Sequence, residues 1–302
     1  MQYDFLVRLQ ELSSPLLDAA ANILSLLGEQ GVMIVVLVLI YYIVGKKEAF
    51  AVFSSLLIAE VATNTIKAVV RAPRPFMVHP TLAADRLETA TGYSFPSGHT
   101  TGAAAFYPAL ARLSGKAWAI AVAIVLAILI GLSRNYLAVH WPVDVIVGLM
   151  IGLVSSLALS PHLAKWYEDE EKRLKFCRIA CPISLAAALL LTAHMSLLGG
   201  DERAYSDLMR LLALSGGAWA GCILETRKVS FRVQHRPLKA VAVIALTLVG
   251  VIVIMALKPL FPSPFDQLGA FIRYSILGLW AIGLAPLICL RLGLLDSASS
   301  DS

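Results

Sequence analysis

Long apolar runs are the feature that most restricts how this chain can fold. Several of them approach the roughly 20 residues that a helix needs to cross a bilayer. The clearest are Ala117 to Leu132, Val143 to Leu159, Ile179 to Leu198 and Leu238 to Leu257. Charged residues make up only 15% of the chain, whereas a soluble domain carries about 25%. The sequence therefore predicts an all-α, polytopic helical membrane protein.

Helix-start signals and apolar stretches predict ten membrane spans. The first begins at Ser14-Pro15, with Ser as the N-cap and Pro at the first helical position. The expected spans are 14–28, 31–45, 48–67, 99–113, 117–133, 141–161, 179–198, 204–224, 238–258 and 267–292. We divide the chain into a six-helix core (1–162), a charged cytoplasmic linker (163–178) and a C-terminal transmembrane bundle (179–302), whose role the sequence does not indicate. We expect no removable signal peptide, because the first residues lack a basic region and a cleavage pattern.

Basic residues are concentrated in every second loop. The richer set is Lys46, Lys47, Arg112, Lys116, Lys165, Lys172, Arg173, Lys175, Arg178, Arg227, Lys228, Arg232, Arg236, Lys239 and Arg291. By the positive-inside rule these loops are expected in the cytoplasm. Both termini should then be cytoplasmic, and loops 68–96 and 134–140 should face outward. The net charge of +5 does not argue for a nucleic-acid partner. The chain has no Asn-x-Ser/Thr sequon and a compact architecture, so we expect a bacterial plasma membrane.

Three cationic side chains are expected near the outward ends of these spans, namely Lys67, Arg74 and Arg134. Ionisable groups at membrane depth are unfavourable and usually functional. The three cations would repel one another unless an anion with two or more charges lay between them. Arg offers a planar fork and Lys a point charge, and both suit phosphate. The residues therefore predict a phosphate site.

A second anion cradle is expected where Pro96-Ser97-Gly98-His99 opens a helix. The free N–H groups and positive dipole of a helix N-terminus favour anions. Gly98 lets the backbone approach a ligand closely. His99, in the same turn, could protonate a departing oxygen.

His140 and Asp144 are four residues apart, so they can share one face of a helix. A carboxylate that accepts a hydrogen bond from one imidazole nitrogen leaves the other free to attack phosphorus. His162, His194 and His235 fit no site and are expected to be structural. We expect no metal and no cofactor, because three cations oppose a divalent ion and no third neutral ligand is evident. Cys177 and Cys181 lack a second Cys/His pair at zinc spacing, and all four cysteines are expected to be buried in helices.

Three spacings together resemble the motifs of the type 2 phosphatidic acid phosphatase (PAP2) superfamily. Lys67 is followed after six residues by Arg74-Pro75, then comes Pro96-Ser97-Gly98-His99, and Ser133-Arg134 is followed after five residues by His140 and after three more by Asp144. The resemblance covers about residues 1–162. It implies a six-helix core with the site at the extracytoplasmic face. It also implies that His140 is the nucleophile, His99 the acid and Asp144 the orienting residue, with phosphate bound by Lys67, Arg74, Ser97, Gly98 and Arg134.

The expected function is hydrolysis of a lipid phosphate or diphosphate at the outer face. Candidate substrates are a polyprenyl diphosphate, phosphatidylglycerol phosphate and phosphatidic acid. Two alternatives stay open: a lipid phosphotransferase using the same phosphohistidine, and a non-catalytic lipid transporter or binding protein. In the C-terminal bundle, Gly217 and Gly221 favour close helix packing. That packing is expected within the chain, and a dimer seam is the alternative.

Overall fold

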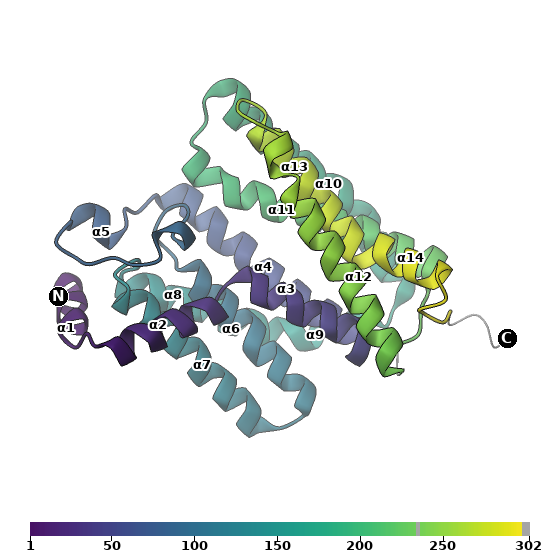
Figure 1. Cartoon of the computed structure of the whole chain (residues 1–302), viewed down its shortest axis with the longest axis horizontal. Helices are drawn as coiled ribbons and strands as arrows, with labels where there is room; N and C mark the ends of the chain where they lie inside the picture. Colours follow the sequence, from purple (N-terminus) through teal and green to yellow (C-terminus); the bar gives the residue numbers. More distant parts are fainter. Residues whose placement is uncertain (234–235, 298–302) are drawn as a thin grey trace. The chain divides into compact units, whose positions relative to one another are not determined.

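The computed structural model describes residues 1–233 and 236–297 (Figure 1). This part of the chain is helical, and its one β-pairing is an isolated bridge between Phe231 and Ser297, so the predicted all-α class is confirmed. His235 lies outside the described residues. The helices are α1 (Gln2–Glu11), α2 (Pro15–Leu27), α3 (Gln30–Leu39), η1 (Ile40–Val44), α4 (Lys46–Val70), α5 (Pro75–Val78), η2 (Leu87–Thr89), α6 (Gly98–Ala111), η3 (Arg112–Ser114), α7 (Ala117–Tyr136), α8 (Pro142–Leu153), η4 (Val154–Leu159), α9 (Ser160–Tyr167), α10 (Glu170–Leu198), α11 (Glu202–Leu224), η5 (Glu225–Val229), α12 (Pro237–Ala256), η6 (Lys258–Leu260), α13 (Asp266–Leu279), η7 (Trp280–Leu284) and α14 (Ala285–Arg291).

The chain forms two compact units. Unit 1 comprises Met1–Ile34 and Ala51–Leu163, and unit 2 comprises Val35–Phe50 and the chain from Ala164 onward. Segment 163–178, which we expected as a linker, is helical except at Glu168 and Asp169. The Asp169 side chain accepts a hydrogen bond from the Lys172 N–H over 3.0 Å and so caps the start of α10.

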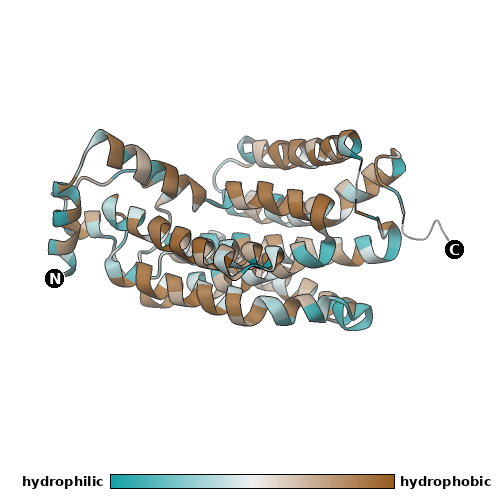
Figure 2. Ribbon diagram, turned by 90° about the horizontal axis from the view of Figure 1, so that it is seen from below, coloured by the Kyte–Doolittle hydropathy of each residue, from teal (hydrophilic) through white to brown (hydrophobic). Residues whose placement is uncertain are grey.

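Seven helices in the described part are long and apolar enough to cross a membrane. Figure 2 shows hydrophobic residues along the middle of these helices and hydrophilic residues at many of their ends. Three of the ten expected spans form helices close to the predicted bounds that are individually too short to count as membrane spans. The span expected at 99–113 is α6, whose 14 residues extend about 21 Å at 1.5 Å per residue, less than the roughly 30 Å hydrocarbon core.

The first two expected spans form a single bent pair. Pro15–Leu27 and Gln30–Val44 meet at an angle of 53° across a short break, and only together do they have the length and hydropathy of a span. The number of full-length spans is therefore corrected from ten to seven, or eight if the pair is one span.

This bent pair also changes the expected position of the N-terminus. At the start of α2, Asp18 accepts a hydrogen bond from Tyr136, the last residue of α7. Before it, the Gln2 side chain accepts a hydrogen bond from the Val143 N–H over 3.3 Å, at the first turn of α8. Residues 1–14 thus lie at the end of unit 1 where α7 ends and α8 begins. The expectation that both termini lie on the side opposite this end is wrong for the N-terminus.

Of helices α6, α7 and α8 in unit 1, α6 is the most buried, and it packs against both of the other two. Ala103 and Ala104 of α6 pack on Ala127 and Ile130 of α7. On the α8 side the backbones nearly touch, because a Cβ added to Gly148 would lie 2.8 Å from the Ser97 carbonyl oxygen. Close packing of this kind is typical of membrane helices with small residues at the contact. It fixes the beginning of α6 against the first turns of α8.

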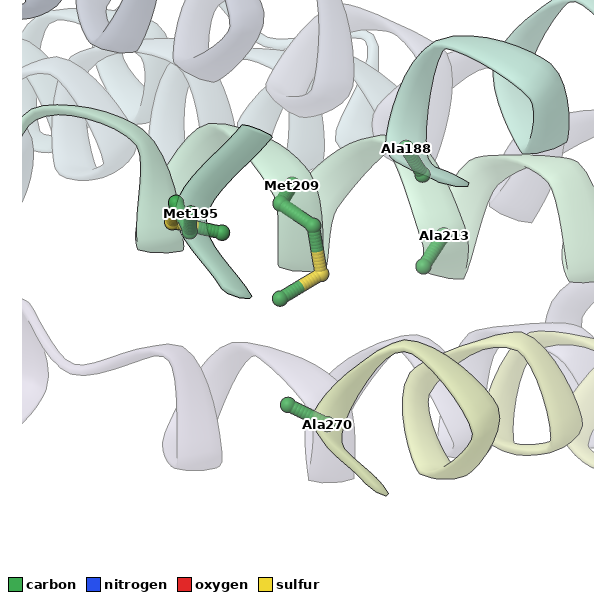
Figure 3. Close-up of a cluster of buried hydrophobic side chains, with 5 residues drawn as sticks. All are labelled: Ala188, Met195, Met209, Ala213 and Ala270. Carbon is green, nitrogen blue, oxygen red and sulfur yellow. The ribbon is translucent and has the colours of Figure 1, made fainter. Parts of the chain in front are cut away.

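In unit 2, helices α10, α11 and α13 pack around a small apolar cluster. Its side chains are Ala188, Met195, Met209, Ala213 and Ala270 (Figure 3). Gly217 of α11 lies against α13, since an added Cβ would be 1.9 Å from the Ser275 carbonyl oxygen. The small residues predicted to allow close packing are therefore used within the chain.

Candidate active site

Lys67 and Arg74 flank the end of α4. Lys67 lies in its last turn, and Arg74 immediately precedes the short helix α5. Lys67 Nζ donates a hydrogen bond to the Tyr93 carbonyl oxygen over 2.8 Å. Arg74 Nε donates to the Gly92 carbonyl over 3.2 Å, and its Nη2 donates to the Thr91 carbonyl. Both side chains are buried. A carbonyl is a neutral partner, so these bonds orient the two cations without cancelling their charge.

Arg134 occupies the last turn of α7 and is fully buried. Its Nη1 donates to the Ser25 hydroxyl of α2, and its Nη2 donates to the Thr89 hydroxyl over 3.2 Å. Its Nε has no hydrogen-bond partner among the described residues. The two hydroxyl partners of Arg134 are neutral, so these bonds orient the guanidinium without cancelling its charge.

The first turn of α6 carries Ser97, Gly98 and His99. Ser97 is the N-cap: its hydroxyl accepts hydrogen bonds from the Thr100 N–H over 3.5 Å and from the Thr100 hydroxyl over 2.8 Å. The Ser97 N–H donates to the Asp144 carbonyl oxygen over 3.0 Å, which joins the beginnings of α6 and α8. Among the described residues, the Nε2 atom of His99 has no hydrogen-bond partner although it is buried.

His140 lies between α7 and α8, with a bonded group on each side of its ring. Its Nδ1 is 3.2 Å from Asp144 Oδ2, and its Nε2 is 3.1 Å from Arg74 Nη1. Arginine has only donors, so Nε2 must accept this bond. The proton of the neutral imidazole therefore sits on Nδ1, where it is donated to Asp144. The lone pair of Nε2 points toward the cationic side of the site.

Asp144 is held by several donors that converge on one oxygen. Besides His140, its Oδ2 accepts hydrogen bonds from the Trp141 N–H over 2.8 Å and from the Ser94 hydroxyl. Within the described residues, its Oδ1 is buried without a partner. The carboxylate is thus fixed in rotation, and it fixes the imidazole in turn.

The surroundings of His140 favour its neutral form. Burial, followed by the positive charges of Arg74 and Lys67, holds the pKa of His140 well below its ordinary value. A neutral imidazole keeps the lone pair that a nucleophile needs.

The structure brings together most of the residues singled out in the sequence. Arg74, His140 and Asp144 form one hydrogen-bonded chain. Lys67 joins this chain because its Nζ and Arg74 Nη2 both donate to the Tyr93 carbonyl, the second over 3.5 Å. Arg134 adjoins it through its carbonyl oxygen, which accepts from the His140 N–H over 3.3 Å. Ser97 is attached through the Asp144 carbonyl.

His99 lies beside Gly28, where an added Cβ would be 3.2 Å from His99 Cδ2. Besides burial, the charges of Arg134, Lys67 and Arg74 lie close enough to His99 to lower its pKa. A Cβ added to Gly98 would meet the Glu60 carboxylate at 3.9 Å, which is ordinary contact. The roles expected of Gly98 and His99 stay predictions. Among the described residues, no group of three His, Cys, Asp or Glu side chains could hold a metal ion.

Two family models match this chain. The PAP2 superfamily model matches residues 48–168, and the model for the transmembrane extension of PAP2 superfamily phosphatases matches residues 209–299. Together they cover more than half of the chain. The chain belongs to the PAP2 superfamily.

Several known proteins share the PAP2 region. An undecaprenyl-diphosphatase of Sulfolobus acidocaldarius is 36% identical over 35% of this chain and 51% of the relative. Phosphatidylglycerophosphatase B of Bacillus subtilis is 35% identical over 28% of this chain and 44% of the relative. The chain thus spans about half the length of the curated relatives it matches. The crystal structure of Aquifex aeolicus LpxE has a TM-score of 0.47 and 25% identity, and the match covers 53% of this chain and 93% of that one.

Three residues outside the PAP2 motifs position the site and were missed in the sequence. Ser94 binds Asp144, while Ser25 and Thr89 bind Arg134. A weak signal existed for Ser25, because a serine inside an apolar helix needs a hydrogen-bond partner. Ser94 directly precedes Phe95-Pro96 and could have been considered with that motif. Nothing in the sequence distinguishes Thr89 from its neighbours.

Proposed function

We propose that this protein hydrolyses a lipid phosphate or diphosphate through a phosphohistidine on His140, at the extracytoplasmic face of the membrane and without a metal or cofactor. The observation that carries the proposal is the arrangement around one imidazole. Nδ1 of His140 is bonded to Asp144, and Nε2 is 3.1 Å from Arg74 in a buried site with further cations. A neutral imidazole with its lone pair toward cations is poised to attack a phosphate.

The phosphoryl group would be bound by Lys67, Arg74 and Arg134, together with the Ser97 hydroxyl and the backbone at Gly98. Phosphoryl transfer needs chiefly positioning and neutralisation of charge on the non-bridging oxygens. The three cations are held by neutral carbonyl and hydroxyl groups. The donors of these three side chains are those that bind the non-bridging oxygens of a phosphate dianion most strongly.

In the first step, Nε2 of His140 forms a bond to phosphorus as the bond from phosphorus to the leaving oxygen breaks. Burial, followed by the positive charges of Arg134 and Lys67, holds the pKa of His99 well below its ordinary value. The step therefore requires that the bound phosphate dianion offset these charges and favour the protonated form of His99, which then gives its proton to that oxygen. The modified imidazole retains its Nδ1 proton and becomes positively charged, and the Asp144 carboxylate stabilises it. In the second step, water attacks phosphorus and gives a proton to His99. The N–P bond breaks, and phosphate and neutral His140 are restored.

A lipid substrate is supported by the position of the site within a membrane protein and by its relatives. Lys67 and Arg134 lie in the last turns of α4 and α7, which are two of the membrane-spanning helices. The relatives carry the names undecaprenyl-diphosphatase and phosphatidylglycerophosphatase B. A polyprenyl diphosphate, phosphatidylglycerol phosphate and phosphatidic acid are accordingly the substrates to test.

The outward orientation is supported by charges at the opposite end of unit 1. The site lies where α6 begins and α7 ends. The loop at the other ends of these helices carries Arg112 and Lys116. By the positive-inside rule that loop is cytoplasmic. Cysteine accessibility at Ser114, compared with accessibility at Glu88 in the loop before α6, tests this orientation in intact cells or spheroplasts.

The proposal is tested by phosphate release from a panel of these three lipids in detergent micelles. The wild-type protein should release phosphate, and the His140→Ala protein should not. His162→Ala is a matched control, because His162 is an exposed residue of α9, and it should behave as wild type. Unaltered turnover by His140→Ala would remove the mechanism. Binding of all three lipids by the wild type without release would favour the non-catalytic alternative.

Two further measurements separate the chemical alternatives. Activity should survive EDTA and be inhibited by vanadate, whereas loss in EDTA would contradict the metal-free proposal. Adding lipid alcohols to the assay identifies a phosphotransferase. Such an enzyme would produce a phosphorylated lipid alcohol instead of free inorganic phosphate.

A further inference from the structure

Unit 1 contains a pocket of about 310 Å³ that the proposed mechanism does not use. It is lined by Gln2, Val70, Ala72, Phe95, Trp141, Val143 and Asp144. These residues come from α1, the end of α4, the segment before α6 and the beginning of α8. The volume lies at the lower end of the roughly 300–1,000 Å³ of small-molecule sites. The pocket can therefore take part of a ligand.

The lining excludes phosphate from this pocket. Asp144 is its one ionisable lining residue, and a carboxylate repels an anion. Lys67, Arg74 and Arg134, the cations of the site, are not among the lining residues. The Gln2 amide oxygen already accepts the Val143 N–H over 3.3 Å, and the Trp141 indole N–H donates to the Pro73 carbonyl over 3.1 Å. What remains is an apolar wall made of Val70, Ala72, Phe95, Trp141 and Val143.

The surroundings of the pocket indicate an occupant that comes from the bilayer. Val69 is 77% exposed and Val70 49% at the end of α4, and Val143 is 40% exposed at the beginning of α8. Both helices belong to membrane-spanning segments. An exposed apolar surface in such segments faces hydrocarbon, so a lipid chain can pass from the bilayer into the pocket without crossing water.

The pocket also adjoins the proposed nucleophile. Asp144 lines the pocket and is bonded through Oδ2 to Nδ1 of His140. The two nitrogens of one imidazole thus face different surroundings, Nε2 the cations and Nδ1 the carboxylate at the edge of the apolar pocket. A lipid phosphate has the same division between a charged head and an apolar chain.

From these observations we propose that this pocket binds the apolar chain of the substrate next to its phosphate, with Val70, Ala72, Phe95 and Val143 as the residues that select for it. The inference rests on the proposed function, because it assumes a lipid phosphate at His140. Only the part of the chain nearest the phosphate fits, and the remainder of a long chain lies in the bilayer. Selection then acts on the shape of the first carbons and not on total length.

The test is to fill the pocket and compare two substrates. Val143→Trp and Ala72→Leu, at two lining residues from different segments, should each lower kcat/KM for the lipid phosphate that the wild type hydrolyses best by about tenfold or more, since one misfitted methylene in an apolar pocket changes kcat/KM by ~10–200-fold. Hydrolysis of p-nitrophenyl phosphate, which has no chain, should change less than about twofold, and this retained activity also shows that the variant is folded. Ile146→Trp is the matched control, because Ile146 is 56% exposed one turn along α8 and does not line the pocket.

Each outcome decides between the two proposals. Equal losses on both substrates, or no loss on the lipid, would overturn the pocket assignment while the phosphatase proposal stands. An equal effect of Ile146→Trp on the lipid would also overturn it, because a general disturbance of α8 would then explain the loss. A wild-type protein that releases no phosphate from any lipid would instead refute the proposed function. In that case, equal binding of a chain-bearing lipid phosphate by wild type and Val143→Trp would refute the pocket separately.

Discussion

Arg74 donates a hydrogen bond to Nε2 of His140 over 3.1 Å, so the guanidinium occupies the lone pair that would attack phosphorus. The same Nη1 also donates to the Val139 carbonyl over 2.9 Å, and Nε and Nη2 are held by the loop at residues 91–93. Arg74 is therefore well fixed before any ligand arrives. In the proposed mechanism, a bound phosphate would accept hydrogen bonds from this guanidinium in place of the imidazole nitrogen, which would then be free to attack.

Arg74→Lys should lower kcat by a factor on the order of 10² or more, as the loss of a positioned donor at developing charge does in other enzymes. Lysine keeps the charge but has no planar fork for two partners. Steady-state kinetics on the best lipid substrate measure the effect. Arg71→Lys is the control, since Arg71 is exposed just beyond the end of α4. A kcat within twofold of wild type in Arg74→Lys would show that charge alone suffices at this position.

Ser94→Ala should lower kcat by about tenfold, corresponding to loss of a hydrogen bond to a charged group. Ser94 donates to the same Asp144 oxygen that binds His140. KM should change little, because Ser94 orients the imidazole through Asp144 and does not bind the phosphate. Ser94→Thr keeps the hydroxyl and should recover most of the activity. A rise in KM with unchanged kcat would contradict this positioning role.

As the pH is lowered, kcat/KM should fall when His140 becomes protonated. The midpoint of this fall should lie below about pH 6.5, the ordinary pKa of histidine. Burial and the neighbouring Arg74 and Lys67 lower the pKa of His140 in the folded protein. Because the attacking form is neutral, a lowered pKa keeps the nucleophile active as the pH falls, until the pH reaches the lowered value. A pH–rate profile from pH 4.5 to 9 measures this fall, which is the acid limb of the profile. An acid limb centred above pH 7 would contradict the prediction.

Gly148→Ala should destabilise the protein by about 1–3 kcal/mol, the usual effect of overpacking. An added Cβ would lie 2.8 Å from the Ser97 carbonyl oxygen and 3.1 Å from Thr101 Oγ1. Activity should fall as well, since α6 and α8 must separate where they position Ser97 and Asp144. Thermal denaturation in detergent and phosphate release measure the two effects. Gly31→Ala in α3 is the control, with nothing within 4 Å of the added atom, and an equal loss of stability there would refute the packing explanation.

The contact between His140 and Asp144 could be predicted because it depends on local spacing. The contact is as expected, but not on one helix face, because His140 lies in the bend before α8, which begins at Pro142. Asp144, in the first turn of α8, reaches back to His140 and to the Trp141 N–H. The contacts of Arg74 could not be predicted in the same way. Its carbonyl partners at Thr91, Gly92 and Val139 involve no side-chain identity. Likewise, Ser25 reaches Arg134 across more than a hundred positions, and no local pattern records such a contact.

For the first two expected spans, hydropathy alone predicted the wrong number of membrane crossings. The apolar stretches before and after Gly28 appear as two spans with a short connection. Hydropathy cannot distinguish a reversal of the chain from a bend of 53°, because both require only a few residues without regular helix. The orientation of residues 1–14 depended on that distinction. The composition of the chain and its long apolar runs, by contrast, predicted the all-α class without any knowledge of connections.

The Tyr93 carbonyl, which accepts from both Lys67 and Arg74, has a consequence for how sequences of this kind can diverge. Every amino acid supplies a carbonyl oxygen, so substitutions at positions 91–93 leave these bonds intact as long as the backbone keeps its course. An insertion or deletion there would move the acceptors away from the cations. Related proteins could therefore differ in the side chains at positions 91 and 93 while keeping the length of the segment and the glycine at position 92, whose φ of 63° favours glycine. Alignments scored by residue identity would undervalue such a segment.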